Sequence, residues 1–352
     1  IFAGDITSSQ SFTWELTING KQIRTGSNSD VSVFWNLIYE NFKKGESKKY
    51  TALLTVTPDD SSCPVVKKSV NFTVTSREKD CKLLIAIDSS LNILSGNLSH
   101  SQNLFTVPNS VLMSDFTLYY NSMEGYSGVL GTGWTHTYNV FLSTDPTDDA
   151  YILSDGRGGK ISLYRNGNYY TSDISVYPML QVNADGTFTL TYKNSTVYHF
   201  NTNGKLTAIT DKNGNTVNLS YSSGGNLVNI TDPAGKVIYL SYDGNSRISA
   251  ITDPNNNSHA FTYSGDTLTS VSSHNSLGTQ TWQYTYDNKA FMLTKTDPDG
   301  HLVQYSYDSE YRVSQTIDPQ GYTRNIQYDP ENSTTTVTEK DGGVWVYKYD
   351  PS

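Results

Sequence analysis

Charge and long apolar runs are both scarce in this chain of 352 residues. Only 17% of the residues are Asp, Glu, Lys or Arg, and the formal net charge is −9. An acidic chain without a Lys- or Arg-rich run lacks the electrostatic footprint of nucleic-acid binding, so we expect no nucleic-acid partner. Because no run of about eighteen or more apolar residues occurs, we also expect no insertion into a membrane.

Neither end of the sequence has the features of a complete secreted protein. The chain begins at Ile1 without the charged and apolar regions of a signal peptide. It stops at Ser352, directly after a repeat-like strand. We therefore expect the chain to be a piece of a longer polypeptide.

Cysteine is rare too, with only Cys63 and Cys81 in the whole chain. Two cysteines that close a short loop predict one disulfide if the protein reaches an oxidising compartment. Two reduced thiols that never meet are the alternative, and the distance between their Cα atoms separates the two interpretations.

Recognisable catalytic and metal-binding patterns are missing from the sequence. No pair of the six histidines has the spacing of an HExxH or zinc-finger site, and neither a Gly-x-Ser-x-Gly elbow nor a phosphate-binding loop occurs. Asp211, Asn213 and Asn215 alternate like calcium ligands. An EF-hand loop, however, needs glycine at its sixth and glutamate at its twelfth position, where this segment has Gly214 fourth and Ser222 twelfth. We therefore interpret the segment as a β-turn, and we expect no enzyme activity, no metal and no cofactor.

Tyrosine and turn-forming residues are what the chain has in abundance. It contains 26 Tyr and 26 Gly, and Ser, Thr and Asn fill much of the rest. Tyr and Thr favour half-buried pleated strands, whereas Gly, Asn, Asp and Pro favour the turns between strands. The composition therefore predicts an all-β protein with many tight turns.

An internal repeat organises residues 151–352. Asp211, Asp232 and Asp253 follow one another at intervals of 21 residues, and Asp297 and Asp318 are again 21 residues apart. Each unit begins with a turn of the Asp-Pro-x-Gly kind and continues with an alternating strand that ends in tyrosine. A second turn and a shorter strand close the unit. A fixed period of this length is the signature of a repeat architecture.

The first strand of each unit alternates strictly between apolar and polar residues. Val217 and Leu219 share one face with the terminal tyrosine, while Thr216 and Asn218 lie between them, and Trp345 takes the position of Val217 in the last unit. This pattern predicts a strand with one buried and one exposed face. The tyrosines that end the strand, here called the ladder tyrosines, are Tyr221, Tyr242, Tyr263, Tyr286, Tyr307, Tyr328 and Tyr349.

The second strand carries apolar pairs three residues apart, such as Leu227 and Ile230, and this spacing predicts a bulge or an early bend. A lone hairpin is marginal in water, so we expect the hairpins to pair edge to edge into one continuous, curved antiparallel sheet. The ladder tyrosines would then form aromatic cross-strand pairs, with Tyr242 packed between Tyr221 and Tyr263. We expect them to stabilise the sheet and not to bind a ligand.

Residues 1–80 have a different pattern. Residues 12–18 predict an alternating strand before an Asn19-Gly20 turn, and residues 48–57 and 67–78 predict two more strands. The Tyr-Thr-x-x-Leu-Thr-Val pattern at residues 50–56 resembles the closing strands of immunoglobulin-like or PKD-like modules. We therefore predict an N-terminal β-sandwich of this kind.

Residues 81–150 join the two parts and hold the most specific motifs of the chain. These motifs are Gly96-Asn97-Leu98, Phe116 through Ser122, and Gly131-Thr132-Gly133-Trp134-Thr135-His136. They resemble the lead module that precedes the YD repeats of Rhs-type and wall-associated bacterial proteins. His136 stands beside Trp134, and we interpret the pair as a packed aromatic motif and not as a catalytic one.

The resemblance implies a structural role. In this family the strands of the YD repeats wind as one sheet into a hollow shell around a C-terminal effector, commonly a toxin. It therefore implies a shell segment of a secreted or cell-surface bacterial protein, whose partner is the effector of the same polypeptide. The alternative is a surface adhesion or carbohydrate-binding module with cell-surface glycans as partners.

The resemblance also raises the question of self-cleavage. Complete cores of this family end in a cleavage segment with two Asp-Pro-x-Gly motifs, and the segments 297–300 and 318–321 match that short motif. Turns of the same kind open the repeat units of this chain, and the longer surroundings of the cleavage segment are missing. We therefore expect these two turns to have no cleavage role.

Overall fold

The computed structural model of the chain describes residues 2–4, 12–18, 20–27, 31–33, 47–58, 65–75, 86–87, 91–107, 110, 112–113, 115–145, 149–172, 175–276 and 278–349. Cys63 and Cys81 lie outside these residues, so their disulfide stays a prediction. The chain forms two compact units, residues 1–83 with 330–334 and 347–352, and residues 84–329 with 335–346. In the described part of the chain, no helix is long and apolar enough to cross a membrane.

The first unit contains a four-stranded antiparallel sheet in the order β3–β2–β5–β6. Its strands are β2 (Phe12–Ile18), β3 (Lys21–Ser27), β5 (Ser47–Pro58) and β6 (Val66–Thr75), which confirms the three strands predicted here. Gly20, with a φ of +78°, lies in the turn that joins β2 to β3. Two short strands, β1 (Phe2–Gly4) and β4 (Val31–Val33), pair with each other. The immunoglobulin-like or PKD-like architecture stays a prediction.

One antiparallel sheet of 21 strands dominates the rest of the chain, and each strand pairs with the next one in the sequence. This confirms the all-β fold and the continuous antiparallel sheet. The strands are β14 (Val140–Thr144), β15 (Ala150–Asp155), β16 (Lys160–Asn166), β17 (Tyr169–Ser172), β18 (Ser175–Val182), β19 (Phe188–Thr191), β20 (Val197–Phe200), β21 (Leu206–Thr210), β22 (Thr216–Tyr221), β23 (Leu227–Thr231), β24 (Val237–Tyr242), β25 (Ile248–Thr252), β26 (Ser258–Ser264), β27 (Thr267–Asn275), β28 (Gly278–Tyr286), β29 (Met292–Thr296), β30 (Leu302–Tyr307), β31 (Val313–Ile317), β32 (Thr323–Asp329), β33 (Thr334–Thr338) and β34 (Val344–Lys348).

The alternation in the first strand of each repeat places one face in the core, as predicted. Val217 and Leu219 of β22 are buried, and so are Ile238 and Leu240 of β24, while the residues between them are partly or fully exposed. Trp345 differs from the prediction, since 59% of its surface is exposed. The reason is its place in β34, which is the edge strand of the sheet and has only β33 as a neighbour among the described strands.

A β-bulge explains the apolar pairs of the second strand. Ser220 pairs with Asn229, but the next residue, Tyr221, pairs with Leu227, which leaves Val228 as the extra residue. Because a bulged strand shifts its alternation by one position, Leu227 and Ile230 both face the core. The predicted irregularity is therefore a bulge, and it recurs beside Tyr242, Tyr263, Tyr286 and Tyr307.

Aspartates close the turns at both ends of the hairpins. One carboxylate oxygen of Asp232 accepts hydrogen bonds from the backbone N–H groups of Ala234 and Lys236, both at 2.8 Å. Asp243, which follows a ladder tyrosine, accepts the same pair of bonds from Asn245 and Arg247 at 2.9 Å. The same arrangement holds at Asp211, Asp253, Asp287, Asp297, Asp308 and Asp318. These side chains replace missing backbone partners in the turns, as Asp characteristically does.

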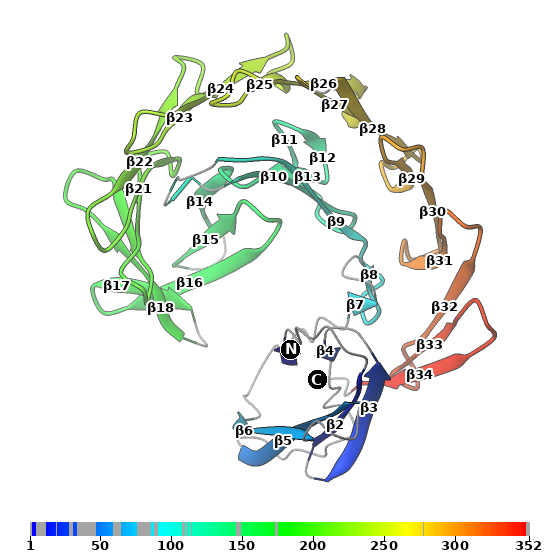
Figure 1. The fold of residues 1–352 in the computed structure, drawn as a ribbon. Helices are drawn as coiled ribbons and strands as arrows, with labels where there is room; N and C mark the ends of the chain where they lie inside the picture. The colour runs from blue at the N-terminus through cyan, green and yellow to red at the C-terminus, as the bar shows by residue number, and fades with distance from the viewer. Residues whose placement is uncertain are drawn as a thin grey trace. The chain divides into compact units, whose positions relative to one another are not determined.

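Residues 91–136, here called the inner layer, form a second, smaller layer in the same unit. A three-stranded sheet in the order β13–β10–β9 is its centre. The strands of this region are β8 (Leu91–Asn92), β9 (Ser99–Thr106), β10 (Asp115–Asn121), β11 (Ser127–Gly128), β12 (Gly131–Thr132) and β13 (Trp134–His136), and the short strand β7 (Ala86–Ile87), just before the layer, pairs with β8. Strands β21 to β31 follow an arc, and β9 to β13 lie on its concave side (Figure 1).

Candidate functional site

Direct hydrogen bonds join the inner layer to the large sheet, and this contact region is here called the seam. The inner layer accepts backbone bonds from two strands, with Ile248 N–H at 2.7 Å from the Val129 carbonyl and Val313 N–H at 2.9 Å from the Gly96 carbonyl. The Thr132 N–H donates in the opposite direction to the Asp266 carbonyl at 2.8 Å. These bonds fix the position of the inner layer relative to β25, β27 and β31 of the large sheet.

Two glycines of the sequence motifs permit this close approach. Gly131 has a φ of +83°, and a Cβ atom added there would collide with the Asp266 carbonyl. Gly96 has a φ of +72°, and its added Cβ would collide with Arg312. A side chain at either position would therefore meet both a strained backbone and a neighbouring strand. Gly133 serves the interior of the layer, because its added Cβ would lie 2.8 Å from the Tyr120 ring.

Trp134 is the largest side chain at the seam and is fully buried. Its indole Nε1 donates a hydrogen bond to the Tyr286 hydroxyl at 2.8 Å. Its ring centroid lies 5.0 Å from that of Tyr284 and 5.3 Å from that of Tyr120. The Tyr120 hydroxyl accepts from the Met292 N–H at 3.0 Å, which links the same cluster to β29. Residues separated by more than 150 positions in sequence thus form one packed group.

Three histidines also lie at or beside the seam, of which His136 and His259 are buried and His100 is half-buried. His136 packs its ring on Phe116 with centroids 4.9 Å apart, and burial lowers its pKa to about 3. Burial and the charge of Lys295 lower the pKa of His100 to about 3. The ring of His259, from the large sheet, stacks on Phe105 of the inner layer at 4.9 Å, and burial again lowers its pKa. All three therefore remain neutral in the folded protein near neutral pH.

The ladder tyrosines contact the backbone and not one another. The Tyr242 hydroxyl donates to the Leu227 carbonyl at 2.8 Å, fifteen residues earlier, at the residue that begins β23. Tyr221, Tyr263, Tyr307 and Tyr328 repeat this bond with Leu206, Ile248, Met292 and Val313, and Tyr286 bonds the Leu268 carbonyl. Tyr349 belongs to the first unit, and its N–H donates to the Ser333 carbonyl at 2.9 Å.

This arrangement differs from the predicted aromatic pairs. Tyr221, Tyr242 and Tyr263 lie at or next to the end of every second strand, so an intervening strand separates successive rings by about 9–10 Å. Among the ring pairs of the described residues, none joins two successive ladder tyrosines. Basic side chains fill part of this space, because the guanidinium of Arg247 lies 4.4 Å from the Tyr263 ring centroid and that of Arg312 lies 4.5 Å from the Tyr328 centroid.

One group of residues in the described sheet has the composition of a catalytic triad. The Ser273 hydroxyl lies 2.8 Å from His259 Nδ1, and His259 Nε2 lies 4.0 Å from the Asp253 carboxylate. All three side chains are buried. The Asp253 carboxylate accepts from the N–H groups of Asn255 and Asn257 and from the Asn257 amide. The aspartate therefore stabilises the turn that contains it, and the buried serine hydroxyl is not accessible to a substrate.

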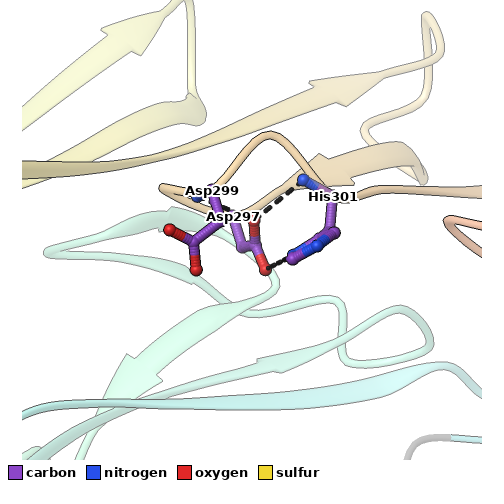
Figure 2. A group of neighbouring side chains, drawn as sticks. All are labelled: Asp297, Asp299 and His301. Carbon is purple, nitrogen blue, oxygen red and sulfur yellow. Dashed lines mark hydrogen bonds and ion pairs between the residues drawn. The ribbon is translucent and has the colours of Figure 1, made fainter.

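Asp297, Asp299 and His301 form the one group of three potential metal ligands in the described part of the chain, with ligand atoms within 4.8 Å of one another. Figure 2 shows the Asp297 carboxylate directed at His301, with the Asp299 carboxylate on its other side. His301 Nδ1 lies 2.8 Å from Asp297, whose other oxygen accepts from two backbone N–H groups. The hydrogen bond raises the pKa of His301, and the bonds from His301 lower the pKa of Asp297. The group is thus a closed turn with an exposed ion pair.

The sequence motifs identified the seam residues of the inner layer but not their partners in the large sheet. Gly96, Gly131 and Trp134 were selected from the sequence, and the structure places all three at the seam. Their partners in the repeats, such as Asp266 and Met292, carry no distinguishing signal in the sequence. In the sequence, each resembles the equivalent residue of the other repeats. Its contact with the inner layer arises only in the folded protein.

Comparisons with family models place two matches on this chain. Residues 176–350 match the model of the teneurin YD-shell, and residues 89–162 match a domain family of unknown function, DUF6531. The first match covers the repeats from β18 onward, and the second covers the inner layer and the first strands of the large sheet. No curated protein matches the chain.

Solved structures resemble the chain only distantly. A crystal structure of TcdB2-TccC3 without its hypervariable C-terminal region is 12% identical with a TM-score of 0.37, and the match covers 73% of this chain and 16% of that one. A mutant Tc holotoxin pore from Photorhabdus luminescens is 13% identical with a TM-score of 0.34, covering 72% of this chain and 14% of that one. This chain therefore spans less than a fifth of the length of these structures.

Proposed function

We propose that this chain is a structural shell segment, of the Rhs/YD-repeat type, of a secreted or cell-surface protein, and the match of residues 176–350 to the teneurin YD-shell model supports this proposal. The segment would enclose or present a C-terminal effector, such as a toxin, that belongs to the same polypeptide. The observation that supports this proposal most is the single antiparallel sheet of 21 strands, which has no break between repeats. A continuous hydrogen-bonded wall is what an enclosing structure requires, since internal sheet edges would be sites of leakage and aggregation.

The seam supports the same role. A sheet built of similar hairpins has few signals that fix its curvature, because each repeat contacts only its neighbours. The inner layer contacts β25, β27 and β31 through backbone hydrogen bonds and β28 and β29 through the Trp134 cluster. These contacts hold distant repeats at set positions along one scaffold. The inner layer would therefore act as a template for the curvature of the wall.

We also propose that the chain has no catalytic activity of its own. Ser273, His259 and Asp253 have triad composition, but burial and turn hydrogen bonds occupy them. The test is an assay of the purified chain with peptide, glycan and nucleic-acid substrates. Reproducible hydrolysis that Ser273→Ala abolishes would refute the proposal.

The adhesion alternative is less well supported at the ladder tyrosines. Six of their hydroxyls donate to backbone carbonyls inside the sheet, as described above for Tyr242. A sugar that stacked on these rings would have to compete with contacts that the sheet itself uses. This observation favours a role of the ladder in stability.

Protease protection tests the enclosing role. The natural polypeptide, including whatever follows residue 352, would be treated with protease under native conditions. We expect the following segment to resist cleavage, and we expect Gly131→Val to expose it by breaking the contact with Asp266. The matched control is Gly244→Ala, at a turn glycine whose added Cβ meets no atom within 4 Å. Equally fast cleavage of the following segment in the parent and in Gly131→Val would contradict the proposal.

A further inference from the structure

Three core positions of the repeat become polar at one place in the sheet. The second strand of a repeat normally buries a branched apolar residue, as at Ile209, Ile230, Ile251 and Val271. Lys295 and Thr316 occupy this position in the next two repeats. In the first strand, Arg324 takes the position held by Val217 and Ile238, and it pairs directly with Thr316. All three side chains are half-buried, so the repeat departs here from the apolar pattern of its other units.

The same three residues line one cavity of about 480 Å³. The cavity lies between β9 of the inner layer, which contributes Ser99 and Ser101, and the strands from β29 to β32. Its volume is in the range of small-molecule sites, about 300–1,000 Å³. The apolar pattern of the repeat is therefore interrupted where space for a ligand opens.

Charged and aromatic groups converge on this cavity. Arg324 is held by Glu339, whose carboxylate oxygens lie 3.0 and 3.1 Å from the guanidinium Nε. The Lys340 ammonium lies 3.9 Å from the centroid of the Tyr322 ring, and 48% of Tyr322 is exposed. With Lys295, the lining has three cationic side chains, against the carboxylates of Glu339 and Asp318. An excess of positive charge beside hydroxyl groups suits a carboxylate on a polyhydroxylated ligand.

His100 adds an independent sign of an incomplete site. It lines the cavity from β9, and its Nε2 atom is buried without a hydrogen-bond partner among the described residues. A buried polar atom of this kind is rare in native proteins and calls for a specific cause. Burial, and to a smaller extent the charge of Lys295, keep the imidazole neutral by lowering its pKa.

We propose that this cavity binds a sugar acid, a monosaccharide or short saccharide that carries a carboxylate. The carboxylate is recognised by Lys295 and Arg324, and the ring hydroxyls by Ser99, Ser101 and Thr316. The exposed Tyr322 ring provides the flat apolar surface against which sugar rings pack. This site differs from the ladder tyrosines, and its ligand is independent of the shell function.

Calorimetric titration of the chain with D-glucuronate tests the proposal, with D-glucose and acetate as controls. We expect glucuronate to bind, and both controls to bind at least tenfold more weakly. The informative variant is Lys295→Ile, which restores the residue type of the other repeats and should leave the thermal midpoint equal or higher. We expect it to weaken glucuronate binding at least tenfold, and Thr316→Val to weaken it several-fold without unfolding.

The matched control is Lys212→Ile, which removes the same charge from an exposed turn outside the cavity and should leave binding unchanged. Absence of glucuronate binding by the folded parent would overturn the proposal. Equal binding by the parent and Lys295→Ile would also overturn it, as would equal binding of glucose or acetate. Tighter binding of a short acidic peptide than of glucuronate would assign the cavity to a polypeptide and refute a saccharide ligand.

Discussion

At the residue scale, six of the seven ladder tyrosines donate a hydroxyl hydrogen bond to the backbone at the bulge of the preceding hairpin. Tyr242 donates to the carbonyl of Leu227, the residue at which the register shifts beside Tyr221. A bulge leaves a polar group of the backbone without its ladder partner, and the tyrosine hydroxyl supplies one. The tyrosine of the repeat therefore contributes a hydrogen bond through its hydroxyl as well as packing through its ring.

Removal of one ladder hydroxyl tests this role. We expect Tyr242→Phe to lower the free energy of unfolding by about 1 kcal/mol, because the Leu227 carbonyl loses its partner. Truncation to alanine, which also removes the ring, should cost about 3–5 kcal/mol. Urea unfolding measures both changes.

Two control variants accompany this measurement. Tyr239 lies in the same strand with 54% of its surface exposed, so Tyr239→Phe should change the free energy of unfolding by less than about 0.5 kcal/mol. Ser241→Ala on the exposed face should be equally silent. Equal losses in Tyr242→Phe and Tyr239→Phe would show that the ladder hydroxyl has no special role.

Ala290 carries backbone strain at a turn position that favours glycine. Its φ is +69°, and Gly300 and Gly321 occupy the corresponding position, three residues after the turn aspartate, in the turns that link neighbouring hairpins. A left-handed conformation costs an L-residue roughly 1 kcal/mol more than glycine. We therefore expect Ala290→Gly to raise the free energy of unfolding by up to about 1 kcal/mol, less the entropy that glycine adds to the unfolded chain.

Differential scanning calorimetry of Ala290→Gly beside Ala250→Gly checks this expectation. Ala250 lies within β25, where glycine weakens a strand, so this variant should be destabilised by about 0.5–1 kcal/mol. A lower thermal midpoint for Ala290→Gly than for the parent would contradict the argument.

At the scale of elements, we expect the seam between the inner layer and the sheet to lose stability in acid. His100 and His136 have a folded-state pKa of about 3, against an ordinary value of 6.5. A depressed histidine pKa means that the neutral form is preferred in the folded protein. Stability from these groups is therefore fully present above about pH 6.5 and is lost as the pH falls from 6.5 toward 3.

Urea unfolding at pH 7, 5 and 4 tests this pH dependence. Each buried histidine removes at most about 1.4 kcal/mol per pH unit within that window. We expect His136→Phe, which keeps a ring against Phe116, to reduce the loss. The turn carboxylates, such as Asp211 with its lowered pKa, lose their stabilisation as the pH falls toward and below about 4, so the interval from pH 7 to pH 5 reports mainly on the histidines.

The elements also show what sequence can and cannot predict. Alternation gave the strands of the repeats, and the pair Leu227 and Ile230 indicated the bulge, because both signals are local. The prediction that successive ladder tyrosines contact one another was wrong, because the second strand of each hairpin lies between their rings. The seam was not predictable, since Tyr120 meets Met292 across 172 positions of sequence and Met292 differs little from its equivalents in other repeats.

At the scale of the whole second unit, the inner layer and the repeat sheet form one structure. Trp134 is fully buried between them, with Tyr284 and Tyr286 on one side and Tyr120 on the other. If the inner layer sets the curvature of the wall, then damage at this residue must spread into the repeats. If it is only an attached segment, the repeats will retain their own stability, as independent repeat arrays do.

Hydrogen exchange of Trp134→Ala, followed strand by strand by mass spectrometry, tests this central claim most directly. The substitution should cost about 3–5 kcal/mol, and Trp345→Ala, at a tryptophan with 59% of its surface exposed, is the control. We predict faster exchange in β9, β10 and β13 together with β26 to β30, and no such change in the control. Faster exchange confined to the inner layer, with the repeat strands as protected as in the parent, would contradict the account.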